Sequence, residues 1–259
     1  MTRGSLPRRS RRRRPALLLA LAGLLIAACA DGDGGESDTV LVYAAASLTD
    51  AFIDLEIEFE SANNDVDVRL NFAGSSTLRE QVLEGAPADV FASANIAVMT
   101  ELVEAGAARR PADFASNRLE IAVPVGNPEG VTGLNDFADQ TLLVGVCAVG
   151  VPCGDLSRIV LGNAGVDLAA DTHEPDVRSL LTKIEAGELD AGLVYRTDVL
   201  SQANEVDGLA IPSDVNRSSI YPIATLTEAP NDLDATRFVE FVLSARGRDV
   251  LAGHGFDAP

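Results

Sequence analysis

The hydrophobic period of this chain changes repeatedly from two to about 3.6 residues and back, and this alternation constrains the fold more than any other feature. The apolar run at 39–45, TVLVYAA, is typical of a buried strand. The segment at 48–61 repeats its apolar residues at helical spacing, with Phe52, Leu55 and Phe59 on one face. Strands that alternate with helices in this way predict an α/β fold with mostly parallel sheets flanked by helices.

The same succession continues to the end of the chain, and no internal repeat interrupts it. We expect further strands at 66–72, 88–94, 118–125, 141–147, 189–197 and 219–226. We expect further helices at 77–84, 153–165, 176–188 and 234–244, another that ends near residue 104, and a short one before the final HGFDAP.

The length of the chain after its N-terminal region, about 220 residues, allows one large domain or two lobes of about 110 residues each. Glycine and proline near 124–133 and 212–230 favour two lobes that are connected by crossing strands. We therefore predict lobe 1 at 38–118 plus 229–259 and lobe 2 at 119–228.

Residues 1–28 have the composition of a signal peptide, with an arginine-rich start before the apolar run PALLLALAGLLIAA. A transmembrane anchor is the alternative, but the run is shorter than the ~20 residues that a span requires. The IAAC at 26–29 resembles a lipobox, which predicts lipidation of Cys29 and an exported lipoprotein on the outer face of the cytoplasmic membrane. Residues 29–37 are then a flexible tether rich in glycine and aspartate. The string SRRRR leaves both the general and the twin-arginine export routes open.

The charge of the chain is strongly acidic. Seven of the 20 basic residues lie in segment 1–28, which has no acid, so the remainder carries 13 basic and 39 acidic residues, a net charge of −26. This excess argues against nucleic acid as a partner, because binding to nucleic acid requires basic patches. It suits a strongly solvated, monomeric protein.

Besides Cys29, the chain has two cysteines, Cys147 and Cys153. In an exported protein such a pair is more often bridged than free. A bridge would close the short loop VCAVGVPCG, which contains two glycines and a proline. We predict a disulfide, with two separate small core residues as the alternative.

Three strand-to-helix junctions share small residues and hydroxyls: AAASLTD at 44–50, FAGSSTLRE at 72–80 and GVPCGDLS at 150–157. A helix N-terminus carries unpaired N–H groups and a partial positive charge, which together can bind an anion. Small side chains let a ligand approach the backbone closely. In open α/β sheets, ligands bind outside the carboxyl ends of the strands, where these junctions lie.

Simple helix capping is an alternative explanation of the same serines. Ser47 could be an N-cap, with Asp50 completing a weak capping box. Ser75 and Ser76, followed by Thr77, could cap the next helix in the same manner. The junctions alone leave both interpretations open.

Read together with GAPADVFASA at 85–94, PDVRSLL at 175–181 and AGLVYRTD at 191–198, these junctions resemble the periplasmic molybdate-binding proteins of ABC importers. The order and spacing agree from about residue 40 to residue 257. The resemblance implies a two-lobed periplasmic-binding-protein fold of type II, with the ligand cleft between the lobes. It also implies a non-enzymatic protein that captures molybdate or tungstate and delivers it to a membrane permease driven by a cytoplasmic ATPase.

In that family the oxyanion is held by neutral hydrogen bonds, without a cationic side chain, a metal ion or a cofactor. The resemblance implies that Ser47 and Ser75 donate from hydroxyl and backbone N–H groups of lobe 1. From lobe 2, it implies backbone N–H donation by Cys153 and Val177 and phenolic O–H donation by Tyr195.

Alternatives exist at three of these positions. Alanine is usual in the family where this chain has Cys153, so a thiol that faced the ligand would invalidate that contact. Ser76 competes with Ser75 for the same role. Arg178, next to Val177, is a cation that could pair with an anion, but we rank it below the N–H groups and expect it to form a salt bridge or to orient the lobes.

An enzymatic function is not expected. The chain has only two histidines, His173 and His254, and it lacks the G-x-S-x-G, H-E-x-x-H, paired C-x-x-C and P-loop motifs. The remaining alternatives are a binding protein for another tetrahedral oxyanion, such as sulfate, and a surface-anchored oxyanion sensor without a transporter.

Overall fold

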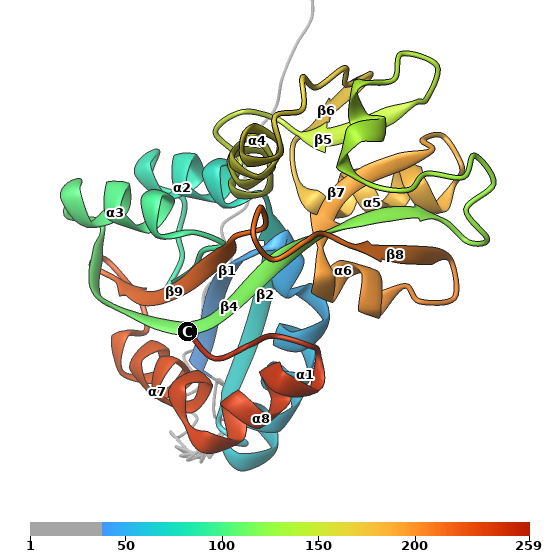
Figure 1. The fold of residues 1–259 in the computed structure, drawn as a ribbon. Helices are drawn as coiled ribbons and strands as arrows, with labels where there is room; N and C mark the ends of the chain where they lie inside the picture. Colours follow the sequence, from blue (N-terminus) through green and yellow to red (C-terminus); the bar gives the residue numbers. More distant parts are fainter. Residues whose placement is uncertain (1–37) are drawn as a thin grey trace, which may run out of the picture. The chain divides into compact units, whose positions relative to one another are not determined.

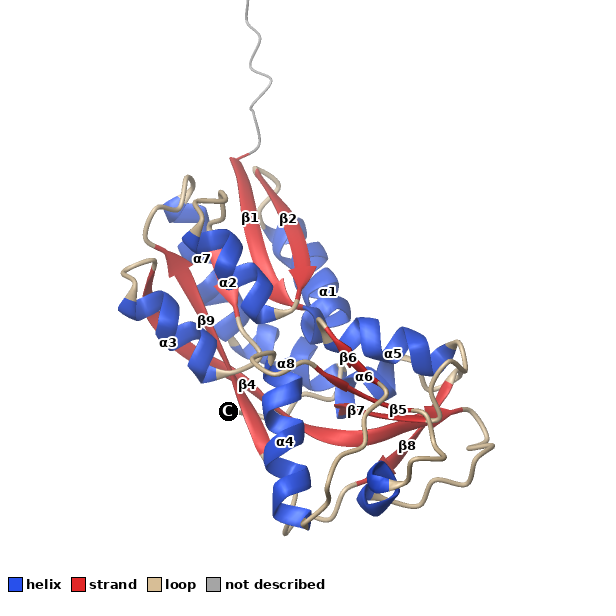
Figure 2. Cartoon of the chain, turned by 90° about the horizontal axis from the view of Figure 1, so that it is seen from above, coloured by secondary structure: helices blue, strands red, loops and turns tan. Residues whose placement is uncertain are grey.

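The computed structural model of the protein describes residues 38–259. The predicted signal peptide at 1–28, the lipidation site Cys29 and the tether at 29–37 lie outside the described residues. Within 38–259, no helix combines the length and the apolar character that crossing a membrane would need. Residues 38–259 belong to one compact unit, and they form eight α-helices and nine strands (Figures 1 and 2).

Lobe 1 is built on a sheet in which β1 (Asp38–Ala45) lies between β2 (Val66–Ala73) and β3 (Val90–Ala92), both of them parallel to it. β3 also pairs in antiparallel fashion with β9 (Ser218–Leu226), and β9 pairs with β4 (Ala108–Pro124). The carboxyl ends of β1 and β2 therefore lie at the same edge of the sheet.

Helices cover both faces of this sheet. Val90 of β3 packs in one cluster with Phe52 of α1 and Phe238 of α7. The next residue, Phe91, packs in another cluster with Leu78 of α2 and Met99 of α3. Because consecutive residues of a strand face opposite sides, α1 and α7 cover one face while α2 and α3 cover the other (Figure 1). The helices of lobe 1 are α1 (Thr49–Ala62), α2 (Ser75–Leu83), α3 (Ile96–Glu104), α7 (Asp232–Leu243) and α8 (Ala245–Gly253).

Lobe 2 has a second, smaller set of strands. β5 pairs in parallel with β6 and β7, while β7 and β8 pair in antiparallel fashion with the second part of β4. Gly145 of β5 and Gly192 of β7 lie opposite each other, and a Cβ on either would come within 2.7 Å of a side chain of α5. These glycines therefore allow α5 to pack directly on the strands. The elements are β5 (Val144–Cys147), β6 (Thr172–Glu174), β7 (Ala191–Tyr195), β8 (Val206–Ala210), α4 (Pro152–Ala164), α5 (Val177–Glu185), α6 (Arg196–Ser201) and the 3-10 helix η2 (Leu134–Ala138).

The two lobes share the 17-residue strand β4. Its residues 108–118 pair with β9, and its residues 119–124 pair with β7 and β8. The sequence predicted a strand only from residue 118, because RRPADFAS before it has a proline and little alternation. The structure explains this difference by a register shift between Arg109 and Ala112, where Pro111 needs no ladder hydrogen bond.

The C-terminal residues return to the middle of β4. The backbone N–H of Ser116 donates to Asp257 O at 2.8 Å, and the N–H of Asp257 donates back to Ser116 O at 3.0 Å. The Ser116 hydroxyl also donates to Ala258 O at 2.7 Å. The end of the chain is thereby fixed beside the strand that joins the lobes (Figure 1).

The α/β fold class and the two-lobed architecture are confirmed. The parallel pairing predicted from the sequence holds among β1, β2 and β3 and among β5, β6 and β7, but every antiparallel pairing of the described residues involves β4 or β9. The lobe division stays a prediction. Because β9 pairs with β3 and with the first part of β4, the strand pairing favours a boundary near residue 217 rather than at 228.

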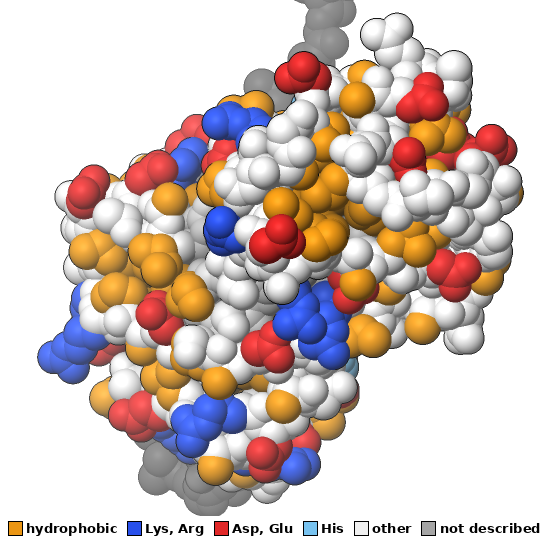
Figure 3. All heavy atoms as spheres, viewed as in Figure 1, with side chains coloured by type: hydrophobic (Ala, Val, Ile, Leu, Met, Phe, Trp, Pro, Cys, Tyr) orange, Lys and Arg blue, Asp and Glu red, His pale blue; other side chains and the backbone are white. Residues whose placement is uncertain are grey.

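Charged side chains of both signs are interspersed on the face drawn in Figure 3. Arg79 pairs with Glu101 at 2.6 Å, and Arg118 pairs with Asp257 at 3.3 Å. Each of these two arginines is thus paired with an acidic neighbour.

Candidate functional site

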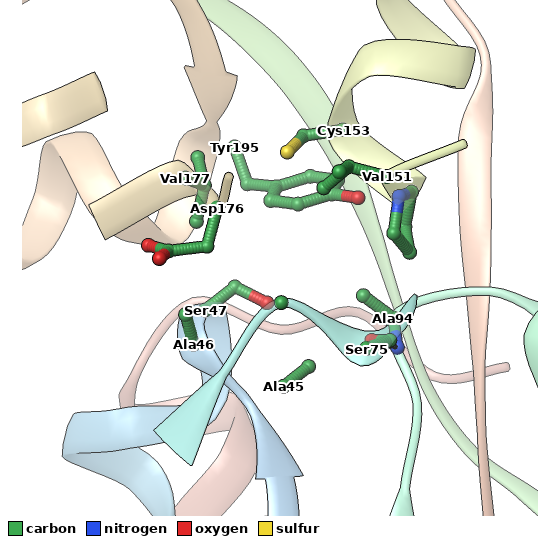
Figure 4. A pocket seen from close by; sticks show the side chains of 12 residues that line it. Ala45, Ala46, Ser47, Ser75, Ala94, Val151, Cys153, Asp176, Val177 and Tyr195 are labelled. Atoms are coloured by element: carbon green, nitrogen blue, oxygen red, sulfur yellow. Dashed lines mark hydrogen bonds between the residues drawn. The ribbon is translucent and has the colours of Figure 1, made fainter. Parts of the chain in front are cut away.

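The three small-residue junctions meet at one pocket between the lobes (Figure 4). Its cavity volume is about 10 Å³, far below the roughly 300–1,000 Å³ of pockets that hold organic ligands. All five residues that the sequence predicted as ligand contacts line it. The lining residues are Ala45, Ala46, Ser47, Gly74, Ser75, Ala94, Val151, Pro152, Cys153, Asp176, Val177 and Tyr195.

Ser47 lies in a single 3-10 turn, η1 (Ala46–Leu48), between β1 and α1. Its hydroxyl does not cap a helix: no side-chain cap is formed at the start of η1 or of α1. Instead, Ser47 Oγ lies 3.0 Å from the hydroxyl of Tyr221, deep behind the pocket. The capping interpretation of Ser47 is therefore wrong for this structure.

Ser75 is the first residue of α2, and Gly74 before it is the N-cap without any side-chain bond. Ser75 Oγ accepts a hydrogen bond from the backbone N–H of Ala94 at 3.0 Å. Its hydroxyl hydrogen is thus not used in that bond, and its backbone N–H has no acceptor within the helix. Ser76 does not line the pocket, so the geometry favours Ser75 over Ser76.

Cys153 is at the second position of α4, where Pro152 occupies the first. Its sulfur is bonded to Cys147 at the end of β5, so Cys153 has no free thiol. The group that Cys153 can offer as a donor is its backbone N–H at the start of the helix. Gly154 explains why α4 begins so close to the strand: a Cβ there would lie 2.1 Å from Ala148 O and 2.4 Å from Cys147 O. Gly154 thus lets α4 start directly beside the end of β5, and the disulfide links the two elements.

Val177 is the first residue of α5, and its side chain is buried in the core with Leu180 and Ile184. Its N–H lies at the helix start, where no intrahelical acceptor exists. The cap is Asp176, whose two carboxylate oxygens accept from the backbone N–H and the hydroxyl of Ser179, both at 2.9 Å. Asp176 lines the pocket but was not predicted as a site residue. The Asp-x-x-Ser spacing at a helix start was the signal that could have identified it.

Tyr195, at the end of β7, is 1% exposed and points its ring into the pocket (Figure 4). Burial raises the pKa of its phenol well above the usual value, so the O–H stays protonated. The hydroxyls of Tyr221 and Ser219 moderate this shift, but neither completes a hydrogen bond, and among residues 38–259 the Tyr195 oxygen has no partner. A buried hydroxyl of this kind is costly to leave unpaired, so it suits a ligand acceptor.

The pocket is therefore rich in neutral donors. Its walls carry no Lys or Arg side chain, and its only charged side chain is Asp176, whose oxygens are already engaged by Ser179. The starts of α2, α4 and α5 supply N–H groups and a partial positive charge. Within 38–259, no group of His, Cys, Asp and Glu side chains could hold a metal ion.

Arg178 does not line the pocket. Its guanidinium forms ion pairs with Asp50 of α1 and with Asp198 of α6, the latter at 3.2 Å, and donates to Ser201 Oγ at 3.1 Å. The bond angles between Arg178 Nε and Asp198 Oδ1 do not make a hydrogen bond, so that contact is an ion pair only. Arg178 thus joins lobe 2 to lobe 1, as expected from the sequence, and is not a ligand contact.

The lobes also touch directly at the pocket. A Cβ added to Gly74 of lobe 1 would lie 2.4 Å from the carbonyl oxygen of Pro175 in lobe 2. Only glycine at this position permits such an approach. The structure is therefore a closed arrangement of the two lobes around a small site.

A donor-lined pocket between two α/β lobes that share crossing strands defines the class of two-lobed periplasmic binding proteins. In agreement, the profile of the bacterial extracellular solute-binding protein family matches residues 40–257. The chain belongs to this family, which is a family of solute-binding proteins and not of enzymes.

Two relatives show what this chain is similar to. The molybdate-binding protein ModA of Mycobacterium tuberculosis is 38% identical over 222 residues, which cover 85% of each chain. The putative ABC transporter substrate-binding lipoprotein YvgL of Bacillus subtilis is 28% identical over 92% of this chain and 95% of its own length.

Solved structures share the fold. The periplasmic molybdate-binding protein of Azotobacter vinelandii superposes with a TM-score of 0.72 at 17% identity and covers 85% of this chain and 99% of its own. The sulfate-binding protein SubI of Mycobacterium tuberculosis gives a TM-score of 0.74 at 15% identity, over 85% and 87%. At these identities the likeness concerns the fold alone.

Proposed function

We propose that this protein binds molybdate, and tungstate with it, in the interlobe pocket and delivers the ion to an ABC importer through its permease and ATPase. The observation that carries the proposal is the unpartnered, buried hydroxyl of Tyr195 facing Ser47, Ser75 and the starts of α4 and α5. The relatives named as molybdate-binding proteins support the choice of ion. Binding neither forms nor breaks a covalent bond. The ion stabilises the closed arrangement of the lobes by accepting hydrogen bonds from both of them.

The donor set favours a fully deprotonated tetrahedral ion. Molybdate and tungstate carry no proton at neutral pH, so every oxygen can accept. A protonated phosphate would need an acceptor, and the one carboxylate among the residues that line the pocket, Asp176, already caps the start of α5 through Ser179. Sulfate is smaller, so its hydrogen bonds to the same donors would be stretched. The acidic surface disfavours the binding of an anion only slightly, because exposed charges beyond ~10 Å are screened at 0.1 M salt.

Calorimetric titration tests the proposal. Residues 38–259 form one unit with its own core and can be produced without the N-terminal region. We expect submicromolar binding of molybdate and tungstate and no measurable heat with sulfate or phosphate. Preference for sulfate would assign the protein to another oxyanion, and the absence of any oxyanion binding would leave the proposal without its ligand.

We further propose that Cys29 is lipidated and anchors the protein at the outer face of the cytoplasmic membrane. The IAAC sequence supports this, and the B. subtilis relative is named as a lipoprotein. Cys29→Ser should release the protein from the membrane fraction into the soluble fraction, as measured by fractionation and immunoblotting. Equal membrane retention of the variant would contradict the anchor.

A further inference from the structure

Tyr221 lies behind the pocket and contacts a predicted donor from each lobe. It is in β9, is completely buried and does not line the pocket. Its hydroxyl lies 3.0 Å from Ser47 Oγ of lobe 1. Its ring packs edge-on against the ring of Tyr195 of lobe 2, with centroids 5.8 Å apart and planes at 69°.

The bond between Ser47 and Tyr221 can run in two directions, and the direction matters for the ligand. A serine hydroxyl has one hydrogen and two lone pairs. If Ser47 donates to Tyr221, only lone pairs of Ser47 face the pocket, and these repel a deprotonated oxyanion. If Tyr221 donates to Ser47, the Ser47 hydrogen is free for the oxyanion.

The neighbours of Tyr221 favour the second direction. Asn117 of β4 pairs with Ser219 of β9, so its side chain shares a face of the sheet with Tyr221, two residues further along. Asn117 Oδ1 accepts from the backbone N–H of Arg118 at 3.0 Å, and Asn117 Nδ2 donates to Thr197 Oγ1 at 2.8 Å. The amide orientation is thereby fixed with its NH₂ group inward.

An NH₂ group can only donate, so the Asn117 side chain offers no acceptor for the Tyr221 hydrogen. Burial raises the pKa of Tyr221 well above its usual value, while Ser47 and, to a smaller extent, Asn117 lower it, so the phenol keeps its hydrogen. Among residues 38–259, Ser47 Oγ is the hydrogen-bond partner of the buried Tyr221 hydroxyl, so the Tyr221 hydrogen is directed toward Ser47. The Ser47 hydrogen is then free to point into the pocket.

We propose that Tyr221 is a positioning residue that turns the Ser47 hydroxyl hydrogen into the oxyanion pocket. This inference rests on the proposed function, since it concerns the same pocket. Tyr221 itself does not touch the ion. It prepares one donor through a hydrogen bond and holds the ring of another, Tyr195, by packing, so that a buried residue outside the pocket lining contributes to affinity.

A double-mutant cycle tests the role of Tyr221. Tyr221→Phe keeps the ring and its packing and removes only the hydroxyl, and we expect molybdate affinity to fall about tenfold, the usual size of a hydrogen-bond effect. If Tyr221 acts through Ser47, Tyr221→Phe should cause no further loss in the Ser47→Ala background. Tyr43→Phe is the matched control, because Tyr43 packs against the α2–α3 cluster and its variant should bind as the parent does.

Each outcome of the cycle is decisive. Equal affinity of Tyr221→Phe and the parent, or equal losses in both backgrounds, would overturn the inference, because a purely structural role would weaken binding independently of Ser47. Should Tyr221→Phe fail to fold by circular dichroism, Asn117→Ala replaces it in the same cycle, with a loss expected only when Ser47 is present. Failure of the parent protein to bind molybdate would refute the proposed function instead.

Discussion

Neutral side chains, not cations, form the proposed contacts of this site. Ser47, Ser75 and Tyr195 carry hydroxyls that are buried, and the guanidinium of Arg178, next to Val177 in sequence, is committed to Asp50 and Asp198. Hydrogen bonds to a charged acceptor are stronger than those between neutral groups. A few fixed donors can therefore hold a dianion without a counter-charge, and they can discriminate by size and by protonation state.

We predict that Ser75→Ala weakens molybdate binding roughly 10- to 150-fold, the equivalent of a charge-assisted hydrogen bond of about 1.5–3 kcal/mol. The variant should also lower the unfolding free energy by about 1–3 kcal/mol, because the buried N–H of Ala94 loses its acceptor. Calorimetry and urea unfolding measure the two effects. Ser76→Ala is the control and should bind as the parent does; a loss in Ser76→Ala with none in Ser75→Ala would reverse the assignment of the two serines.

For single residues, the resemblance to known motifs predicted which side chains line the pocket, but it did not predict their hydrogen-bond partners. All five predicted contacts line one pocket, since strand-to-helix junctions at the same sheet edge must converge. The bond from Ser47 to Tyr221 joins residues 174 apart in sequence, and no local pattern predicts such a pair. Asp176 was missed because its capping role is local, whereas its place in the pocket depends on the packing of the lobes.

The start of α6 carries a buried carboxyl group, that of Asp198. Asp198 of α6 is completely buried, and burial raises the pKa of its carboxyl to about 7, although Arg178 and the N–H of Tyr195 oppose the shift. A carboxyl with a raised pKa binds its proton more tightly in the folded than in the unfolded state. Its contribution to stability is then largest below the unfolded pKa of 3.8, decreases as the pH rises toward about 7 and is constant above.

We therefore expect Asp198→Asn to become more stable relative to the parent as the pH rises from 4 to 7, by at most about 1.4 kcal/mol per pH unit. The measurement is the unfolding free energy of both proteins at several pH values. Taking the difference removes the contributions of all other titrating groups. A difference that does not vary with pH would show that the Asp198 carboxyl is not destabilised by burial.

The disulfide between Cys147 and Cys153 ties the end of β5 to the start of α4. We predict that neither cysteine reacts in thiol counting on the unfolded, non-reduced protein. Replacing the pair, Cys147→Ala with Cys153→Ala, should lower the unfolding free energy by about 2 kcal/mol, as expected for a short loop. Molybdate affinity should stay close to that of the parent, because the proposed contact is the Cys153 backbone N–H. A large loss of affinity would mean that the bridge positions this N–H.

Elements differ in how far sequence patterns specify them. Amphipathic helices such as α1, α5 and α7 were predicted close to their observed bounds, because burial of one face fixes their period. Strand β4 before residue 118 was missed, because its pairing with β9 is a tertiary contact that overrides the local preference of Pro111 and its neighbours. Strands β6 and β8 were not predicted, because their sequences THE and VDGLA contain no apolar run of strand length.

For the whole molecule, closure of the lobes depends on an absent side chain. Gly74 lies against Pro175 of the opposite lobe, and a Cβ at 74 would clash with its carbonyl oxygen at 2.4 Å. A backbone oxygen cannot move aside as a flexible side chain could. A larger residue at position 74 would prevent the lobes from closing fully. The donors of lobe 2 would then lie too far from an ion bound to lobe 1.

We accordingly predict that Gly74→Ala weakens molybdate binding about tenfold or more. Affinity should fall tenfold for each ~1.4 kcal/mol by which closure of the lobes becomes less favourable. Because Gly74 is at the start of a helix and not within it, the melting temperature of the ligand-free protein should change little. Small-angle scattering should detect a smaller contraction on addition of molybdate than in the parent. Gly162→Ala, on the exposed side of α4 where no atom lies within 4 Å, is the control; an equal effect in both variants would exclude a role of the Gly74 contact in closure.

Because Asp257 pairs with Ser116, the C-terminal end of the chain can serve as a fixed reference point for measuring the movement of lobe 2. The last residues are fixed beside the strand shared by the lobes, so a fluorophore attached after Pro259 would be displaced little when lobe 2 rotates. A second dye on the exposed loop at 126–130 would move with lobe 2. Energy transfer between the two dyes would then report rotation of lobe 2 alone, which makes the protein a candidate optical sensor for its ion.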